Sequence, residues 1–79
     1  MTLQAVKLSS LKKGDSCIIE SFTNEELQLK LMEMGCLPGE LVVVERLAPL
    51  GDPMAIRVSG YTLSIRLDEA SLIMVTASR

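Results

Sequence analysis

The segment from residue 27 to residue 53 constrains the fold most, because it joins a helix pattern, two turns and a strand pattern without a linker. It reads LQLKLMEMGCLPGELVVVERLAPLGDP. Good helix formers fill residues 25–34, and Thr23 and Glu26 have the spacing of a capping box at their start. Gly35 follows, where a left-handed residue commonly ends a helix. We therefore predict one short helix that stops at Gly35 and turns directly toward a strand.

Turn signals divide the rest of the chain into short strands. Pro38 and Gly39 predict a type II turn after the helix, and residues 68–70 are predicted to turn again. Four glycines are expected to serve structural turns or caps: Gly14, Gly35, Gly39 and Gly60. The five predicted strands are residues 16–22, 41–48, 54–58, 61–67 and 72–75. This pattern fits a strongly bent sheet, so we predict a single mainly β domain over residues 1–79, a small SH3-like five-stranded barrel with one short inserted α-helix.

The composition limits what a domain of 79 residues can hold. Hydrophobic residues make up 48% of the chain, but Phe22 and Tyr61 are its only aromatic residues, so the core is expected to be aliphatic. Cys17 and Cys36 have no CxxC spacing, and we interpret both as small buried hydrophobic residues. No apolar run approaches the roughly 18 to 20 residues that span a bilayer, and the N-terminus lacks a signal-peptide pattern. A cytoplasmic protein is expected.

Several kinds of chemistry are excluded because their residues are missing. The chain has no histidine, no P-loop and no Gly-x-Gly-x-x-Gly pattern, so we predict that it is not an enzyme. A net charge of −2 and the scarcity of aromatic residues argue against nucleic-acid binding. The acidic pairs Glu25-Glu26 and Asp68-Glu69 are interpreted as a helix N-terminus and a solvated turn. No cofactor is expected, because the sequence lacks the ligand clustering that an Fe²⁺ site needs.

The predicted helix has two apolar faces. At about 100° per residue, Leu27, Leu31 and Met34 form one stripe, while Leu29 and Met32 fall on the other side. A helix lying on a small barrel buries only one face, and the first stripe is the better candidate for the core. The second face is either covered by loops or exposed to a partner, and the sequence does not decide between these alternatives.

Five motifs carry a resemblance to a known family. They are Leu-x-x-Leu-x-x-Gly at residues 8–14, LMEMGCLPG at residues 31–39, APLGDP at residues 48–53, the turn glycine Gly60, and IRLDEA at residues 65–70. With these motifs, which cover nearly the whole chain, it resembles the FeoA family, small cytoplasmic accessory proteins of bacterial ferrous-iron uptake whose domain also occurs fused to iron-dependent repressors. Lys30 stands where that family commonly has arginine, which argues against a bidentate contact at that position.

The resemblance implies an SH3-like fold and a role beside FeoB, the membrane permease with a cytosolic GTP-binding domain. The leading hypothesis is a non-catalytic module that docks on this permease and meets the membrane only through it; self-association is left open. The alternative is a metal-responsive regulatory domain that binds Fe²⁺, as in iron-dependent repressors. A docking surface is predicted on the second helix face, the Pro-Gly turn and the proline-bounded loop. Its residues are Leu29, Met32, Leu37, Pro38, Pro49, Leu50, Gly51, Asp52 and Pro53.

Overall fold

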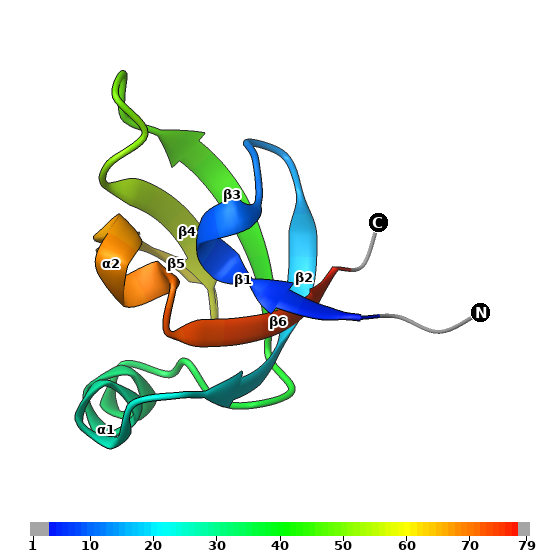
Figure 1. Ribbon diagram of the computed structural model, residues 1–79, viewed down its shortest axis with the longest axis vertical. Coiled ribbons are helices and arrows are strands. Elements are labelled where there is room, and N and C mark those ends of the chain that lie inside the picture. Colours follow the sequence, from blue (N-terminus) through cyan, green and yellow to red (C-terminus); the bar gives the residue numbers. More distant parts are fainter. Residues whose placement is uncertain (1–3, 78–79) are drawn as a thin grey trace.

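The computed structural model describes residues 4–77, which form six antiparallel strands and three short helices (Figure 1). The strands are β1 (Ala5–Lys7), β2 (Ser16–Phe22), β3 (Leu41–Leu47), β4 (Met54–Val58), β5 (Tyr61–Ile65) and β6 (Ile73–Ala77). The helices are the 3-10 helix η1 (Leu8–Ser10) and the α-helices α1 (Glu25–Glu33) and α2 (Leu67–Ala70). The mainly β prediction is confirmed. The predicted domain over residues 1–79 also includes residues 1–3 and 78–79, which lie outside the described residues.

All six strands of the described chain belong to one bent sheet, in the order β1-β6-β2-β3-β4-β5. The register shifts between Ile19 and Ser21 in β2, and again between Val44 and Arg46 in β3. Such bulges strengthen the local twist and help a short sheet to curve. The two edges of the sheet are β1 and β5. The helix that follows β5, α2, contacts η1, which follows β1, so the two ends of the sheet are brought together by helices.

Two elements differ from the sequence prediction. The strand count is six rather than five, because β1 pairs with β6, with Val6 opposite Val75. Three residues carry too little pattern to be recognised as a strand without the distant partner. Residues 68–70 are helical rather than a turn, and α2 begins at Leu67, which the sequence assigned to the preceding strand.

The start of α1 also differs, because the predicted capping box of Thr23 and Glu26 is wrong. The cap is Asn24, whose Oδ1 accepts a hydrogen bond from Leu27 N at 2.9 Å. Thr23 is instead held to the sheet: its backbone N and its Oγ1 donate to Leu72 O at 2.8 and 3.1 Å. Asparagine caps helices at least as well as threonine, so a contact with a distant residue decides which one does so.

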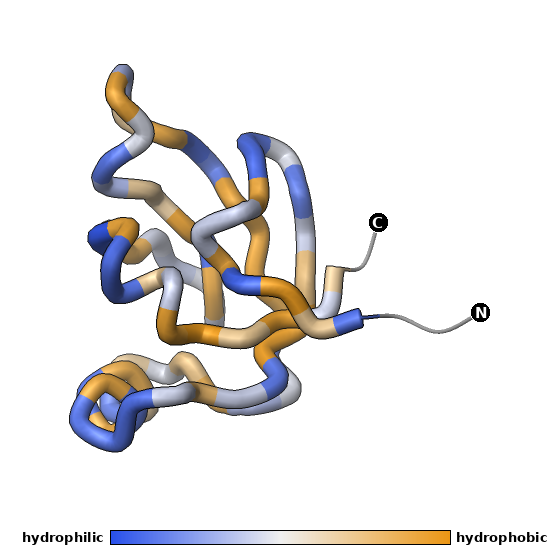
Figure 2. Tube along the Cα trace, in the orientation of Figure 1, coloured by the Kyte–Doolittle hydropathy of each residue, from blue (hydrophilic) through white to orange (hydrophobic). Residues whose placement is uncertain are grey.

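The interior is aliphatic, as the composition predicts. Its buried residues are Leu8, Cys17, Ile19, Leu27, Leu31, Cys36, Val42, Val44, Met54, Ile56, Val58, Ile65, Ala70, Ile73 and Val75. Leu27 and Leu31 of α1 are buried and the partly buried Met34 packs against the core, so the first helix stripe faces the core. Cys17 and Cys36 are free and buried, which confirms their interpretation. No polar side chain in residues 4–77 is buried, and Figure 2 shows polar residues interspersed with the apolar ones along the strands and α1.

The end of α1 is fixed against the turn between β4 and β5. Gly35 has a φ of +89°, which confirms it as the left-handed residue that ends the helix. Ser59 Oγ donates a hydrogen bond to Gly35 O at 3.0 Å. A Cβ atom on Gly35 would lie 3.1 Å from the Tyr61 hydroxyl and 3.2 Å from Ser59 Oγ. The other glycines predicted at turns also have positive φ: Gly14, Gly39 and Gly60.

Replacing Gly35 with alanine is expected to destabilise the domain more than replacing Gly39 does. Both positions have a left-handed backbone, but a Cβ atom on Gly39 meets nothing within 4 Å. We expect Gly39→Ala to lower the free energy of unfolding by about 1 kcal/mol and Gly35→Ala by about 2 to 3 kcal/mol, measured by urea denaturation. Equal losses of unfolding free energy in the two variants would show that Ser59 and Tyr61 move aside for the added Cβ atom without an energetic cost.

Candidate functional site

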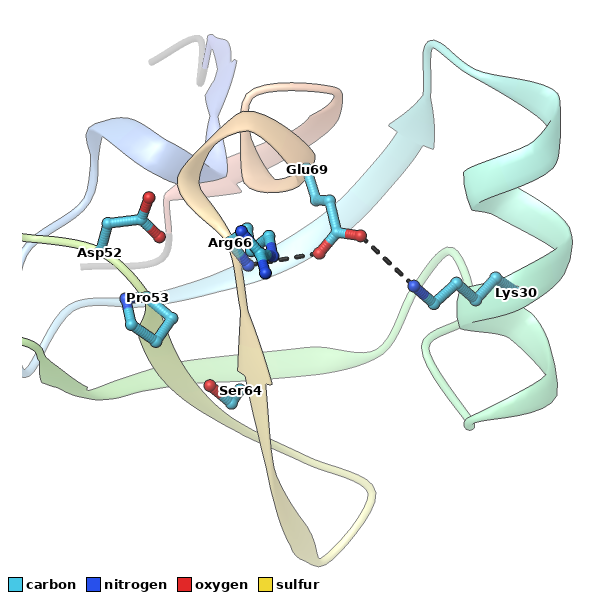
Figure 3. Close-up of a pocket in the computed structure, with 6 residues that line it drawn as sticks. All are labelled: Lys30, Asp52, Pro53, Ser64, Arg66 and Glu69. Atoms are coloured by element: carbon cyan, nitrogen blue, oxygen red, sulfur yellow. Dashed lines mark hydrogen bonds and ion pairs between the residues drawn. The ribbon is translucent and has the colours of Figure 1, made fainter.

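An open polar hollow of about 490 Å³ lies where α1, α2, β5 and the loop between β3 and β4 meet. Its lining residues are Lys30, Asp52, Pro53, Ser64, Arg66 and Glu69. We call it the polar hollow. Figure 3 shows Lys30 extending from α1 toward Glu69 on α2, with Asp52 and Pro53 contributed by the loop. Three separate parts of the chain, α1, the loop between β3 and β4, and the stretch from β5 to α2, therefore present charged or polar side chains to one space.

Glu69 connects two walls of the polar hollow. Its Oε2 lies 3.3 Å from Lys30 Nζ, and its Oε1 accepts a hydrogen bond from Arg66 N at 3.2 Å. The ion pair links α1 to α2, but the Lys30 side chain is 61% exposed. Exposed ion pairs contribute little to stability, about 0 to 1 kcal/mol. The contact therefore serves to orient the two side chains more than to hold the helices together.

Asp52 connects the third wall. Its Oδ1 accepts a hydrogen bond from Leu67 N, the first residue of α2, at 3.1 Å. The carboxylate satisfies a backbone donor that the short helix cannot satisfy by itself. A residue that the sequence assigned to partner binding thus has an internal role, which joins the APLGDP motif to the IRLDEA motif.

Arg66 differs in its pairing from the other charged residues of the polar hollow. Within residues 4–77 its guanidinium takes part in no hydrogen bond or ion pair, and the residue is exposed. Both carboxylates of the hollow, in contrast, accept hydrogen bonds from the protein. The hollow therefore presents the unpaired donors of Arg66 beside two carboxylates that each already accept at least one hydrogen bond.

Two further hollows extend the polar hollow on either side. One, of about 440 Å³, has a mostly apolar lining that includes Leu47, Ala48 and Pro49, and it shares Pro53 and Ser64 with the polar hollow. The other, of about 260 Å³, lies between α1 and α2 and shares Lys30 and Glu69. Together they form a groove from α1 to the loop between β3 and β4, which we call the α1–loop groove.

The structure divides the predicted docking residues between two regions. Leu29 is 66% exposed, Met32 is half-buried, and Leu37 and Pro38 are exposed in the turn after α1. Leu50, at the tip of the other loop, is 94% exposed. β3 has seven residues and spans roughly 20 Å, so the turn and the loop lie at opposite ends of it (Figure 1). Of the predicted set, Asp52 and Pro53 line the polar hollow and Pro49 lines its apolar neighbour.

Sequence reasoning missed Ser64, Arg66 and Glu69 as site residues. Glu69 was interpreted as part of a solvated turn, yet it accepts hydrogen bonds from two walls of the polar hollow. The available signal was the spacing of Arg66 and Glu69, three residues apart, which suits a carboxylate that returns to the backbone at a helix start. That signal predicts the short helix, but not the side of the molecule on which it lies.

The titration of three groups departs from ordinary behaviour. Burial raises the pKa of Cys17 to about 11, with a smaller contribution from Asp15. Burial, and then Glu40, raise the pKa of Cys36. On the outer face of the sheet, hydrogen bonds from Thr62 and Arg57 lower the pKa of the half-buried Glu45. Both thiols are therefore harder to deprotonate than an exposed cysteine, which lowers their reactivity as nucleophiles.

Two structural features bear on metals and membranes. In the stretch from residue 4 to residue 77, no three side chains of histidine, cysteine, aspartate or glutamate gather as a metal site requires. The same stretch contains no helix whose length and apolar character suit a passage across a bilayer. The polar hollow offers positive and negative side chains that could contact a ligand. Among its lining residues, no nucleophile is paired with a base.

Removal of the Asp52 carboxylate is expected to loosen α2. Asp52→Ala leaves Leu67 N without its acceptor and should lower the free energy of unfolding by about 0.5 to 2 kcal/mol in urea denaturation. Asp52→Asn keeps an oxygen in place and should cost less than half as much. An alanine variant as stable as the native chain would show that the contact with Leu67 does not hold the helix.

The buried thiol of Cys17 should make stability depend on alkaline pH. Its pKa is about 11 in the folded state, whereas the ordinary value is 9.0, so the contribution is complete below pH 9 and is lost as the pH rises from 9 to 11. Over this interval, the free energy of unfolding should fall more steeply for the native chain than for Cys17→Ala. Titrations of lysine and tyrosine are common to both proteins. If the free energy of unfolding fell equally with pH in both proteins, the raised pKa of Cys17 would be contradicted.

Comparison with known proteins gives one family and several relatives. The profile of the FeoA domain matches residues 6–77. A relative in Porphyromonas gingivalis, named Fe(2+) transport protein A/Fe(2+) transporter FeoB fusion protein, is 32% identical over 71 residues. These residues are 89% of this chain and 8% of that protein, so the chain spans a small fraction of this relative.

Solved structures confirm the SH3-like fold. An FeoA-like protein from Clostridium acetobutylicum has a TM-score of 0.90 and 32% identity, over 100% of this chain and 92% of that one. FeoA from Stenotrophomonas maltophilia, solved with zinc and described as a prokaryotic SH3 domain protein, has a TM-score of 0.77 and 28% identity, over 89% of this chain and 88% of that one. A manganese-dependent transcriptional repressor shares the fold alone, with a TM-score of 0.84 and 14% identity over 99% of this chain and 44% of the repressor.

Proposed function

Because this chain belongs to the FeoA domain family, we propose that it is a non-catalytic cytoplasmic accessory protein of bacterial ferrous-iron uptake that docks on the cytosolic part of an FeoB-type permease. The observation that carries the proposal is the fusion protein of Porphyromonas gingivalis, to which this chain is similar over 89% of its length. Fusion holds two domains at a high local concentration, which favours even a weak contact between them. Docking on the GTP-binding domain is a finer part of the same proposal, and self-association is left open.

The contact is proposed to use the apolar side chains that the small core leaves outside. α1 buries Leu27 and Leu31, while Leu29 on its outer face is 66% exposed. Leu37 in the following turn is 39% exposed, and Leu50 is almost fully exposed. Leucine and methionine suit a contact with a partner that changes conformation, because such surfaces can re-pack.

Binding to the immobilised cytosolic part of the permease encoded in the same genome tests this function. Leu29→Asp and Leu50→Asp should each weaken binding by about tenfold or more without changing the melting temperature. Leu41→Asp is the matched control, because this leucine is 53% exposed but lies outside the predicted surface. Leu31→Asp, which places a charge in the core, should unfold the domain.

The outcomes separate the parts of the proposal. No binding by the native chain would contradict docking on the permease. A folded Leu31→Asp variant that loses only binding would show that the two faces of α1 are assigned the wrong way round. If Leu41→Asp strongly weakened binding and Leu29→Asp did not, the contact would lie on the sheet and not on the helix.

The alternative, a metal-responsive domain, is tested by titration of the isolated chain with Fe²⁺ under anaerobic conditions. Stoichiometric binding in the micromolar range or tighter would favour it over docking alone. The likeness to a repressor lends it only the fold, because the identity is 14%.

A further inference from the structure

The polar hollow is lined by two carboxylates and two cations, and these groups differ in how they are paired. Asp52 Oδ1 accepts from Leu67 N, and Glu69 accepts from both Lys30 and Arg66 N. The guanidinium of Arg66, in contrast, offers five N–H donors in a planar fork, and none of them has a partner in residues 4–77. An exposed guanidinium is solvated, but here it lines a concave space of about 490 Å³ rather than a convex surface.

Resting on the proposed function, we propose that the polar hollow binds a carboxylate side chain of an acidic segment of the partner permease, with Arg66 as its principal contact. The fork of Arg66 matches a carboxylate in a bidentate arrangement. Lys30 supplies a second positive charge, and its ammonium has three donors, of which one faces Glu69. Ser64, on β5, adds a hydroxyl to the same space.

The neighbouring hollow indicates what lies next to the carboxylate in the bound segment. It is continuous with the polar hollow at Pro53 and Ser64, and its lining includes Leu47, Ala48 and Pro49. An extended chain advances about 3.3 Å per residue, so residues close in sequence reach both hollows. Side chains of an extended segment alternate between its two faces, so the α1–loop groove suits a segment in which an acidic and an apolar residue lie two positions apart.

A charge-deletion series tests the assignment in binding to the cytosolic part of the permease. Arg66→Gln should raise Kd by about tenfold or more, and Arg66→Lys by less, because lysine keeps the charge but loses the fork. Lys13→Gln is the matched control, since Lys13 is exposed and lines none of the three hollows. Added salt should weaken the native complex more than the Arg66→Gln complex. The fold should persist, because Glu69 contacts Arg66 through its backbone N.

Failure of this inference is distinguishable from failure of the proposed function. If the native chain binds the permease and Arg66→Gln binds within twofold of it, the inference is overturned while docking stands. If the native chain does not bind the permease at all, the proposed docking is contradicted. Binding of synthetic peptides to the polar hollow then tests the inference by itself. An acetylated peptide with Glu and Leu two positions apart should then shift the NMR resonance of Arg66 Nε, and its Gln counterpart should not. Equal shifts, or none, would overturn it.

Discussion

The small aliphatic interior is the constraint on which the rest of this structure depends. It is large enough to bury one face of β2, β3, β4 and β6 and one stripe of α1, and it contains no polar side chain of the described residues. Everything else must remain outside, including the second face of α1 and the tip of the loop between β3 and β4. In a domain of this size, an exposed leucine at a helix or loop is a consequence of limited volume before it is a sign of function. The functional argument therefore needs the fusion relative and cannot depend on exposure alone.

Polar contacts between distant segments then place the helices around this interior. Ser59 holds the end of α1 against the hairpin of β4 and β5. Asp52 holds the start of α2, and Glu69 links α2 to α1 through Lys30. Each of these contacts is at the surface and individually weak. Their combined effect is geometric, because they bring four elements to the rim of one groove.

The local features of the fold followed from the sequence, and the features that depend on distant partners did not. Gly35 was assigned from the residues beside it, since a left-handed helix end is a local requirement. β1 was missed because only its pairing with β6 makes Ala5–Lys7 a strand. The cap at Asn24 and the helix at Leu67 depended on contacts with Leu72 and Asp52. The site was hardest to predict for the same reason, since its walls come from separate parts of the chain.

The buried state of the two cysteines has a consequence for oxidative chemistry. In the proposed role the domain works beside a flow of ferrous iron, which reduces oxygen and peroxide to reactive species. An exposed thiolate in that setting would bind the metal or be oxidised to sulfenic and then sulfinic acid. Cys17 and Cys36 are the only cysteines of the chain, both are buried, and burial raises the pKa of both thiols. The barrel therefore offers neither a sink for the transported iron nor a thiol that its redox cycling can readily damage.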